Sequence, residues 1–196
     1  MMNHLEIEFK TLLTQKEFKS IEKQLQEVEP IVQTNYYFDT ESFDLKYHKM
    51  SLRIRIFNDK AELTLKIPQA VGNFEYNHYL TVSEAERMID TNDIHNTFWD
   101  SDLELMQPIK EAGIELTDLK LLGSLTTTRR EISTKIGLMA LDYNYYGGFE
   151  DYELELEVNE AEKGKRDFKA FLESNNIKFK YAKSKVARFS ATLNKP

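Results

Sequence analysis

The sequence predicts one α+β domain with eight or so mostly antiparallel strands. Three observations support this class: runs in which apolar and charged residues alternate, turn residues between neighbouring runs, and amphipathic stretches with helix-start signals. The chain has 196 residues, 41% hydrophobic and 30% charged, which is enough to build a real core. It has no internal repeat, low-complexity tract or linker rich in Pro, Gly or Ser, so we expect a single domain over residues 1–196.

Extended runs account for most of the expected elements. In these runs β-branched, aromatic or aliphatic residues are interleaved with polar ones, and Asn58-Asp59-Lys60 separates two of them as a hairpin turn. Pro68 to Gly72 is an expected loop. The expected strands are Leu5–Lys10, Ile31–Phe38, Met50–Phe57, Ala61–Ile67, Phe74–Val82, Leu121–Ile132, Leu138–Asp142 and Asp151–Val158.

Helix signals occur between and after these runs. Thr14 with Glu17 and Ser83 with Glu86 form two expected capping boxes, and Asn159 is the expected cap of a later helix. The expected helical stretches are residues 15–28, Ser83 to about Gly113, residues 160–174 and Lys183–Leu193.

Composition excludes several classes of protein. The absence of cysteine excludes disulfides, thiolate metal sites and cysteine nucleophiles, and the four histidines lack metal-ligand spacing. A net charge of −7 argues against a broad nucleic-acid-binding surface. The acidic N-terminus is unlike a signal peptide, and no apolar run approaches a membrane span. We therefore expect a soluble, cytoplasmic protein with no nucleic-acid or membrane partner.

Four of the expected strands each have one apolar and one densely charged face. Side chains in a strand alternate between faces, so residues of one parity lie together. The charged faces carry Glu6, Glu8 and Lys10; Arg53 and Arg55; Glu62, Thr64 and Lys66; and Glu153, Glu155 and Glu157.

An ordinary sheet with one face in water could carry such charges as cross-strand ion pairs. The almost complete lack of neutral polar residues on these faces fits that interpretation less well. Rows of glutamates crowd like charges, which a hard divalent cation would relieve, and paired arginines are relieved by a polyanion. Together the faces indicate a site for a metal ion and a phosphate compound.

Charged motifs also occur in a fixed order from residue 6 to about residue 188. They are Glu6-Ile7-Glu8-Phe9-Lys10, Tyr37-Phe38-Asp39-Thr40, Leu52-Arg53-Ile54-Arg55, Leu63-Thr64-Leu65-Lys66, Thr127-Thr128-Arg129-Arg130, Leu141-Asp142, the Glu153, Glu155 and Glu157 strand, and Ser184-Lys185-x-x-Arg188. The set resembles the CYTH domain, or triphosphate tunnel metalloenzyme, family. The match looks closest to its bacterial branch of adenylate cyclase-like and thiamine triphosphatase-like proteins.

The resemblance implies an eight-stranded antiparallel β-barrel with helices packed on the outside and charged faces pointing into a tunnel. It implies a small-molecule triphosphate substrate, with Mg2+ or Mn2+ as cofactor. The implied phosphate ligands are Lys10, Arg53, Arg55, Lys66, Arg129 and Lys185. The implied metal ligands are Glu6, Glu8, Glu153 and Glu155, and the implied catalytic residues are Glu6, Glu8 and Lys10.

Further residues match charged positions of the family less closely. They are Glu75, Asp142, Glu157, Arg130 and Arg188. Only one of the adjacent Arg129 and Arg130 can face inward, and parity with Thr127 and Glu131 favours Arg129.

Three functions remain open at this point. The first is metal-dependent hydrolysis of inorganic triphosphate, thiamine triphosphate or a nucleoside triphosphate. The second is class IV-type adenylate cyclisation of ATP, and the third is binding of polyphosphate or a nucleotide without turnover. A monomer or a homodimer is compatible with each. Tyr143, Tyr145, Tyr146 and Phe149 could stack on a base or thiamine ring, although packing around a turn at Gly147-Gly148 is the favoured interpretation.

Overall fold

The computed structural model describes residues 3–94 and 103–193. In this part of the chain eight strands form a closed antiparallel barrel in the order β1-β5-β4-β3-β2-β6-β7-β8, which confirms the expected fold. The strands are β1 (His4–Leu13), β2 (Ile31–Asp39), β3 (Ser51–Phe57), β4 (Lys60–Pro68), β5 (Asn73–Leu80), β6 (Lys120–Thr134), β7 (Gly137–Tyr146) and β8 (Phe149–Val158).

The helices lie between and after these strands. They are α1 (Gln15–Gln24), α2 (Asp44–Tyr47), α3 (Val82–Thr91), α5 (Gln107–Glu111), α6 (Ala161–Ser174) and α7 (Lys185–Leu193), with 3-10 turns η1 (Glu104–Met106) and η2 (Leu116–Asp118). None of the helices formed by the described residues is both long enough and apolar enough to cross a membrane.

The capping predictions have different outcomes. The box of Thr14 and Glu17 is confirmed at the start of α1. The second box is formed by Thr81 and Glu84 rather than by Ser83 and Glu86, because β5 ends at Leu80 and leaves Thr81 at the cap position. The Asn159 prediction is also wrong: the residue before α6 is Glu160, which makes no side-chain cap hydrogen bond.

The expected helical middle is not continuous. The first helix, α3, ends at Asn92, whose left-handed conformation (φ 55°) stops it. Helical structure returns only at η1 and α5. The part of the prediction that falls on residues 95–102 lies outside the described residues.

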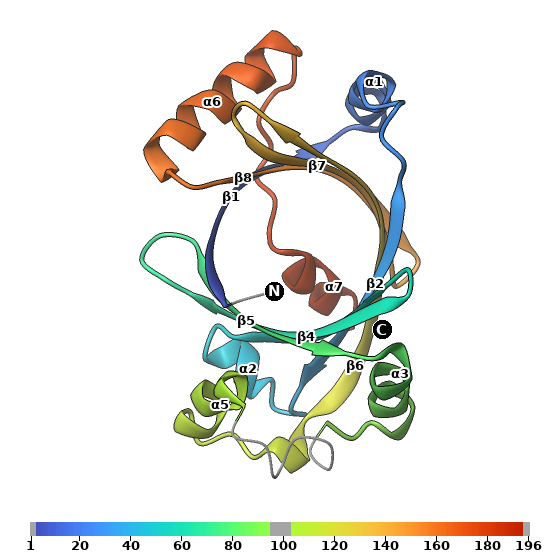
Figure 1. Cartoon of the computed structure of the whole chain (residues 1–196), viewed down its shortest axis with the longest axis vertical. Helices are drawn as coiled ribbons and strands as arrows, with labels where there is room; N and C mark the ends of the chain where they lie inside the picture. Colours follow the sequence, from blue (N-terminus) through green and yellow to red (C-terminus); the bar gives the residue numbers. More distant parts are fainter. Residues whose placement is uncertain (1–2, 95–102, 194–196) are drawn as a thin grey trace. The chain divides into compact units, whose positions relative to one another are not determined.

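The described residues belong to two compact units. The first comprises residues 3–5, 34–94 and 103–124, and the second comprises residues 6–33 and 125–193. In the first unit α2, α3 and α5 lie on the apolar face of β3 and β4 (Figure 1). Ile54 and Leu63 of the strands are fully buried against Met88 of α3 and Ile109 of α5. This packing leaves the other face of the strands for polar residues.

The second unit has helices on both faces of its strands. α1 and α6 cover the apolar face of β7 and β8, where Leu154 and Leu156 pack with Ile21 and Phe168. α7 lies on the opposite, charged face, where its Lys185 contacts carboxylates of β7 and β8 (Figure 1). Thus α1 and α6 pack on the side that the resemblance implied, and α7 brings basic side chains to the charged side.

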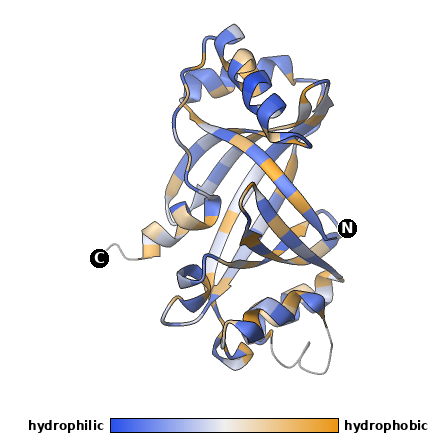
Figure 2. Cartoon of the chain, turned by 90° about the vertical axis from the view of Figure 1, so that its left-hand side faces the viewer, coloured by the Kyte–Doolittle hydropathy of each residue, from blue (hydrophilic) through white to orange (hydrophobic). Residues whose placement is uncertain are grey.

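Strand register groups the charged residues into rows. In the first unit Arg55 lies opposite Glu62, and Lys66 lies opposite Glu75. In the second unit Arg129 of β6 lies opposite Asp142 of β7, and Asp142 lies opposite Glu153 of β8. The strands accordingly alternate between hydrophilic and hydrophobic residues (Figure 2). The separation of charged and apolar faces that parity predicts is present in both units.

Candidate functional site

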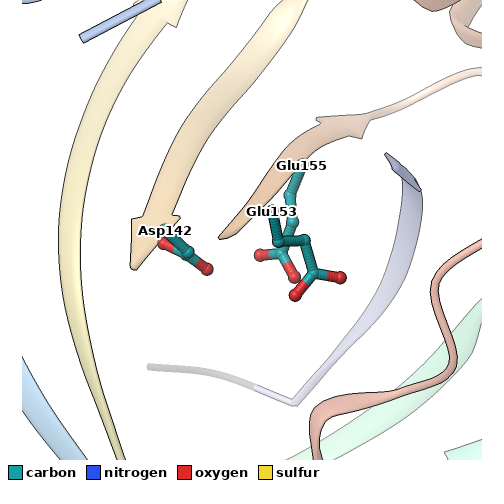
Figure 3. A group of neighbouring side chains, drawn as sticks. All are labelled: Asp142, Glu153 and Glu155. Atoms are coloured by element: carbon teal, nitrogen blue, oxygen red, sulfur yellow. The ribbon is translucent and has the colours of Figure 1, made fainter. Parts of the chain in front are cut away.

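Three carboxylates gather on the charged face of β7 and β8. Asp142, Glu153 and Glu155 each offer an oxygen atom within 4.8 Å of the others, and their side chains point toward one another (Figure 3). Asp142 and Glu153 are completely buried, and Glu155 is 8% exposed. Because carboxylate oxygens are the ligands that hard divalent cations prefer, this group has the donor set of a metal site.

Two cations compensate this carboxylate group. The Lys185 Nζ lies 2.8 Å from Asp142 Oδ2, 3.1 Å from Glu153 Oε2 and 2.5 Å from Glu155 Oε1. Arg129 donates from Nε and Nη2 to the two Asp142 oxygens at 2.8 and 2.7 Å, and it also contacts Glu155. Lys185 and Arg129 therefore pair with the buried carboxylates. The same two cations could pair with phosphate oxygens instead.

Arg188 of α7 completes the arrangement. Its Nη2 and Nη1 donate to the two oxygens of Glu153 at 2.6 and 3.3 Å. Its Nε lies 2.9 Å from Asp151 Oδ2. We call Arg129, Asp142, Asp151, Glu153, Glu155, Lys185 and Arg188 the second-unit cluster.

The opposite charges of this cluster stabilise one another in their ionised forms. Burial alone would raise the pKa of Glu155, but Lys185 and Arg129 outweigh it and hold that pKa well below its usual range. Burial would lower the pKa of Lys185, whereas Asp142, Glu155 and Glu153 raise it well above its usual value. Glu155 is therefore ionised and Lys185 protonated at neutral pH.

The first strand supplies charges beside this cluster. Lys10 lies opposite Glu155 in the β1–β8 register and contacts Glu8. Glu8 lies opposite Glu157. Among the described residues the three-carboxylate group joins Glu153 and Glu155 to Asp142, and it includes none of the other predicted carboxylates, Glu6, Glu8, Glu75 and Glu157. The roles expected of Glu6, Glu8 and Lys10 stay predictions.

Arg129 and Arg130 lie on opposite faces of β6. Arg129 belongs to the second-unit cluster, as parity indicates. Arg130 donates to the Val28 carbonyl oxygen and lies 4.0 Å from Glu22 of α1, on the apolar side of the strand. Arg130 is therefore not part of the charged cluster, and its contacts hold the end of α1.

The first unit has a charged cluster of its own. Lys66 Nζ lies 2.7 Å from Glu75 Oε1, and Arg53 Nη2 lies 3.9 Å from the same atom. Burial would raise the pKa of Glu75, but Lys66 and Arg53 lower it to about 2.

Arg55 is held separately, with its Nη1 3.3 Å from Glu62 Oε1 and its Nε donating to Asn35 Oδ1 at 3.1 Å. We call Arg53, Arg55, Glu62, Lys66 and Glu75 the first-unit cluster.

Three residues that hold cluster side chains had no assigned role in the sequence-based site. Glu62 and Asn35 contact Arg55, and Asp151 contacts Arg188; of the three, the sequence analysis named only Glu62, as part of a charged face. The parity of Asp151 with Glu153 would have pointed to it, since both lie on one face of β8.

The aromatic residues of the β7–β8 hairpin have different surroundings, and Tyr145 and Phe149 are exposed. Gly147 and Gly148 form its turn, with φ values of 54° and 79° that favour glycine. Tyr143 stacks on Tyr152 with ring centroids 5.4 Å apart, which confirms packing for this residue. Tyr146 instead donates its hydroxyl hydrogen to Asp151.

The architecture and both clusters agree with a match found by comparison with known proteins. A family model described as the CYTH domain matches residues 4–190. The chain belongs to the CYTH domain family. The relationship inferred from the ordered motifs is confirmed.

Individual relatives support the same assignment. A Bacillus subtilis (strain 168) protein named "Putative triphosphatase YjbK" is 36% identical over 191 residues, which cover 96% of each chain. A Bacillus halodurans structure described as a "putative adenylate cyclase" has a TM-score of 0.87 at 34% identity, covering 96% of this chain and 99% of that one.

A Hippeastrum protein, HpAC1, shares the CYTH fold at 24% identity with a TM-score of 0.82, covering 95% of this chain and 96% of its own. It is described as an adenylyl cyclase candidate with a dominant triphosphatase activity. Triphosphatase and adenylate cyclase descriptions thus both occur among these CYTH proteins.

Proposed function

We propose that this CYTH domain is a metal-dependent triphosphatase that acts on a small-molecule triphosphate. The observation that carries the proposal is the buried group of Asp142, Glu153 and Glu155 with Lys185 in contact with all three. Such a site can accept a divalent cation and a polyanion together, because it already contains compensating charges of both signs. The name of the Bacillus subtilis relative supports hydrolysis.

In this proposal Asp142, Glu153 and Glu155 hold Mg2+ or Mn2+. The bound ion would supply charge stabilisation to the phosphoryl group during transfer. Lys185, Arg129 and Lys10 bind phosphate oxygens, and Arg53, Arg55 and Lys66 of the first unit are assigned to phosphate oxygens as well.

A glutamate orients the attacking water and accepts its proton, while the bond between the terminal phosphorus and its bridging oxygen breaks. The Glu6–Glu8 row and the Glu153–Glu155 row both remain candidates for this role.

Adenylate cyclisation is a second candidate, because the Bacillus halodurans relative at 34% identity carries that description. In this reaction the ribose 3′-hydroxyl of ATP attacks the α-phosphorus and diphosphate leaves. The same charged groups would hold the triphosphate in both reactions.

Product analysis separates these functions. The purified protein is incubated with inorganic triphosphate, thiamine triphosphate or ATP, each with Mg2+ or Mn2+, and a Glu155→Gln variant is the control for contaminating phosphatases. Orthophosphate release that the variant lacks supports hydrolysis, and cyclic AMP with diphosphate supports cyclisation. Tight binding without any product would establish a binding protein instead. A cytoplasmic location and a monomeric or homodimeric state stay predictions.

A further inference from the structure

Asp151 is the carboxylate of the second-unit cluster that lies outside the group of three. Its Oδ1 accepts a hydrogen bond from Asn144 Nδ2 at 2.9 Å, and its Oδ2 accepts one from the Tyr146 hydroxyl at 2.6 Å. Asn144 is itself fixed, because its Oδ1 accepts a hydrogen bond from Thr127 at 2.7 Å, and both residues are completely buried. The orientation of the Asp151 carboxylate is therefore set by strands β6 and β7.

This oriented carboxylate lies beside the guanidinium group of Arg188 in α7. Its Oδ2 lies 2.9 Å from Arg188 Nε, while the two terminal nitrogens of Arg188 donate to Glu153. Arg188 thus donates two hydrogen bonds to Glu153 and forms an ion pair with Asp151 on the Nε side, which restricts the rotation of its guanidinium. Residues three apart on a helix lie on the same side, so fixing Arg188 also fixes Lys185 one turn earlier.

Apolar packing alone holds α7 weakly. Its buried residues are Phe189 and Ser190. The hairpin turn touches its last turn, since a Cβ atom at Gly147 would lie 2.7 Å from Thr192 Oγ1. The polar contacts of Arg188 and Lys185 therefore contribute much of the free energy that keeps α7 on the charged face.

We propose that Asp151, oriented by Tyr146 and Asn144, is a positioning residue that fixes α7 and thereby places Lys185 among the carboxylates. The inference rests on the proposed function of this site, because Lys185 is assigned there to phosphate oxygens. Asp151 acts through Arg188 and does not itself touch the substrate.

The same hairpin offers matched controls. Tyr143 donates its hydroxyl hydrogen to Glu150 at 2.8 Å, an exposed hydrogen bond between the same two kinds of group. Glu150 is the neighbour of Asp151 in sequence, but its contacts are with Tyr143 and Tyr152. Glu150→Gln and Tyr143→Phe therefore make the equivalent chemical changes, loss of a carboxylate charge and of a hydroxyl group, at residues that do not contact Arg188 in the hydrogen bonds described.

The kinetic test compares Asp151→Asn and Tyr146→Phe with these controls, using Mg2+ and the triphosphate that the wild type hydrolyses. Loss of the buried ion pair between Asp151 and Arg188 predicts about a tenfold rise in KM for Asp151→Asn and a smaller rise for Tyr146→Phe. The controls should stay within about twofold of the wild type.

A double-mutant cycle distinguishes positioning from general destabilisation. In a Lys185→Ala background Asp151→Asn should change KM by less than about twofold, since the group that it positions is already gone. An equal rise in both backgrounds, or no rise in either, would overturn the proposal.

A second test does not depend on turnover. It measures the hydrogen-exchange rates of the α7 backbone amides in the full chain without substrate. Faster exchange in Asp151→Asn and Tyr146→Phe than in Glu150→Gln and Tyr143→Phe supports the proposal that Asp151 fixes α7. Equal exchange in all four variants overturns it. If the wild type neither binds nor hydrolyses a triphosphate, the proposed function fails, and the exchange rates still decide whether Asp151 fixes α7. Tyr146→Phe keeps the test valid if Asp151→Asn does not fold.

Discussion

In the first-unit cluster three cations, Arg53, Arg55 and Lys66, share two carboxylates. In the second-unit cluster three cations share four carboxylates, and each cation has a carboxylate oxygen within 2.9 Å. One cluster therefore has an excess of positive charge and the other an excess of negative charge.

The difference matches two kinds of ligand. A metal cation reduces the electrostatic repulsion within a cluster that has excess carboxylates. Phosphate oxygens reduce the repulsion within a cluster that has excess cations. Under the proposed function we therefore expect the metal ligands in the second unit, and a first-unit cluster that binds phosphate oxygens without metal ligands. Each of the following predictions tests this division.

The largest effect is expected from Glu155→Gln. The change removes one charge from the three-carboxylate group with little change in shape, so turnover should fall by two to three orders of magnitude. Steady-state rates at several Mg2+ concentrations check this, with Glu150→Gln as the control. A near-wild-type rate in Glu155→Gln would contradict the assignment. Glu6→Gln and Glu8→Gln, measured alongside, show whether the first strand matters equally.

Acid should affect the first unit through Glu75. Its pKa is about 2 when folded against an ordinary value of 4.5, so between these values the unfolded chain binds the extra proton. The stability that the carboxylate contributes, about 3 kcal/mol, is therefore present above pH 4.5 and is lost as pH falls toward 2. Urea unfolding of the wild type and Glu75→Gln between pH 2 and 7 checks this. The two curves should converge in acid, and parallel curves would refute the prediction.

Arginine substitutions should separate phosphate binding from metal binding. Arg53→Ala or Arg55→Ala should raise KM for the triphosphate about tenfold while the Mg2+ concentration for half-maximal rate stays unchanged. The corresponding lysine variants should recover only part of the loss, because an ammonium group cannot form the paired hydrogen bonds of a guanidinium. Unchanged kinetics in all four variants would favour cross-strand ion pairs without a binding role.

The smallest effect is a shift in melting temperature. A triphosphate with Mg2+ should raise the melting temperature by a few degrees more than diphosphate or orthophosphate at equal concentration, because it can engage more cations. Thermal melts of the wild type and Glu155→Gln measure it. Equal shifts for all three anions would show that the effect is not specific to the clusters.

The sequence predicted the faces of the strands better than the contacts on them. Alternation placed Arg53, Arg55 and Glu153 on charged faces because a strand buried on one side must alternate. The barrel and the contribution of Lys185 came from the ordered motifs of the family, since no local pattern shows that a C-terminal helix returns to the charged face.

The grouping of carboxylates depends on strand register, which local patterns do not reveal. Glu153 meets Asp142 because β7 and β8 pair in that register, whereas Glu8 lies opposite Glu157. The start of α3 shows the same limit. Thr81-x-x-Glu84 and Ser83-x-x-Glu86 both fit a capping box, and the end of β5 selects the first.

The three contacts of Lys185 have a consequence for selectivity. The site provides its own counter-ions, so a ligand must replace an internal partner before it can bind. A metal ion alone would place a cation beside Lys185 and Arg129, and an anion alone would be repelled by the carboxylates. A metal–phosphate complex would offer a new partner to the carboxylates and to the cations at once. We therefore expect the second unit to bind the two ions together more readily than either one alone.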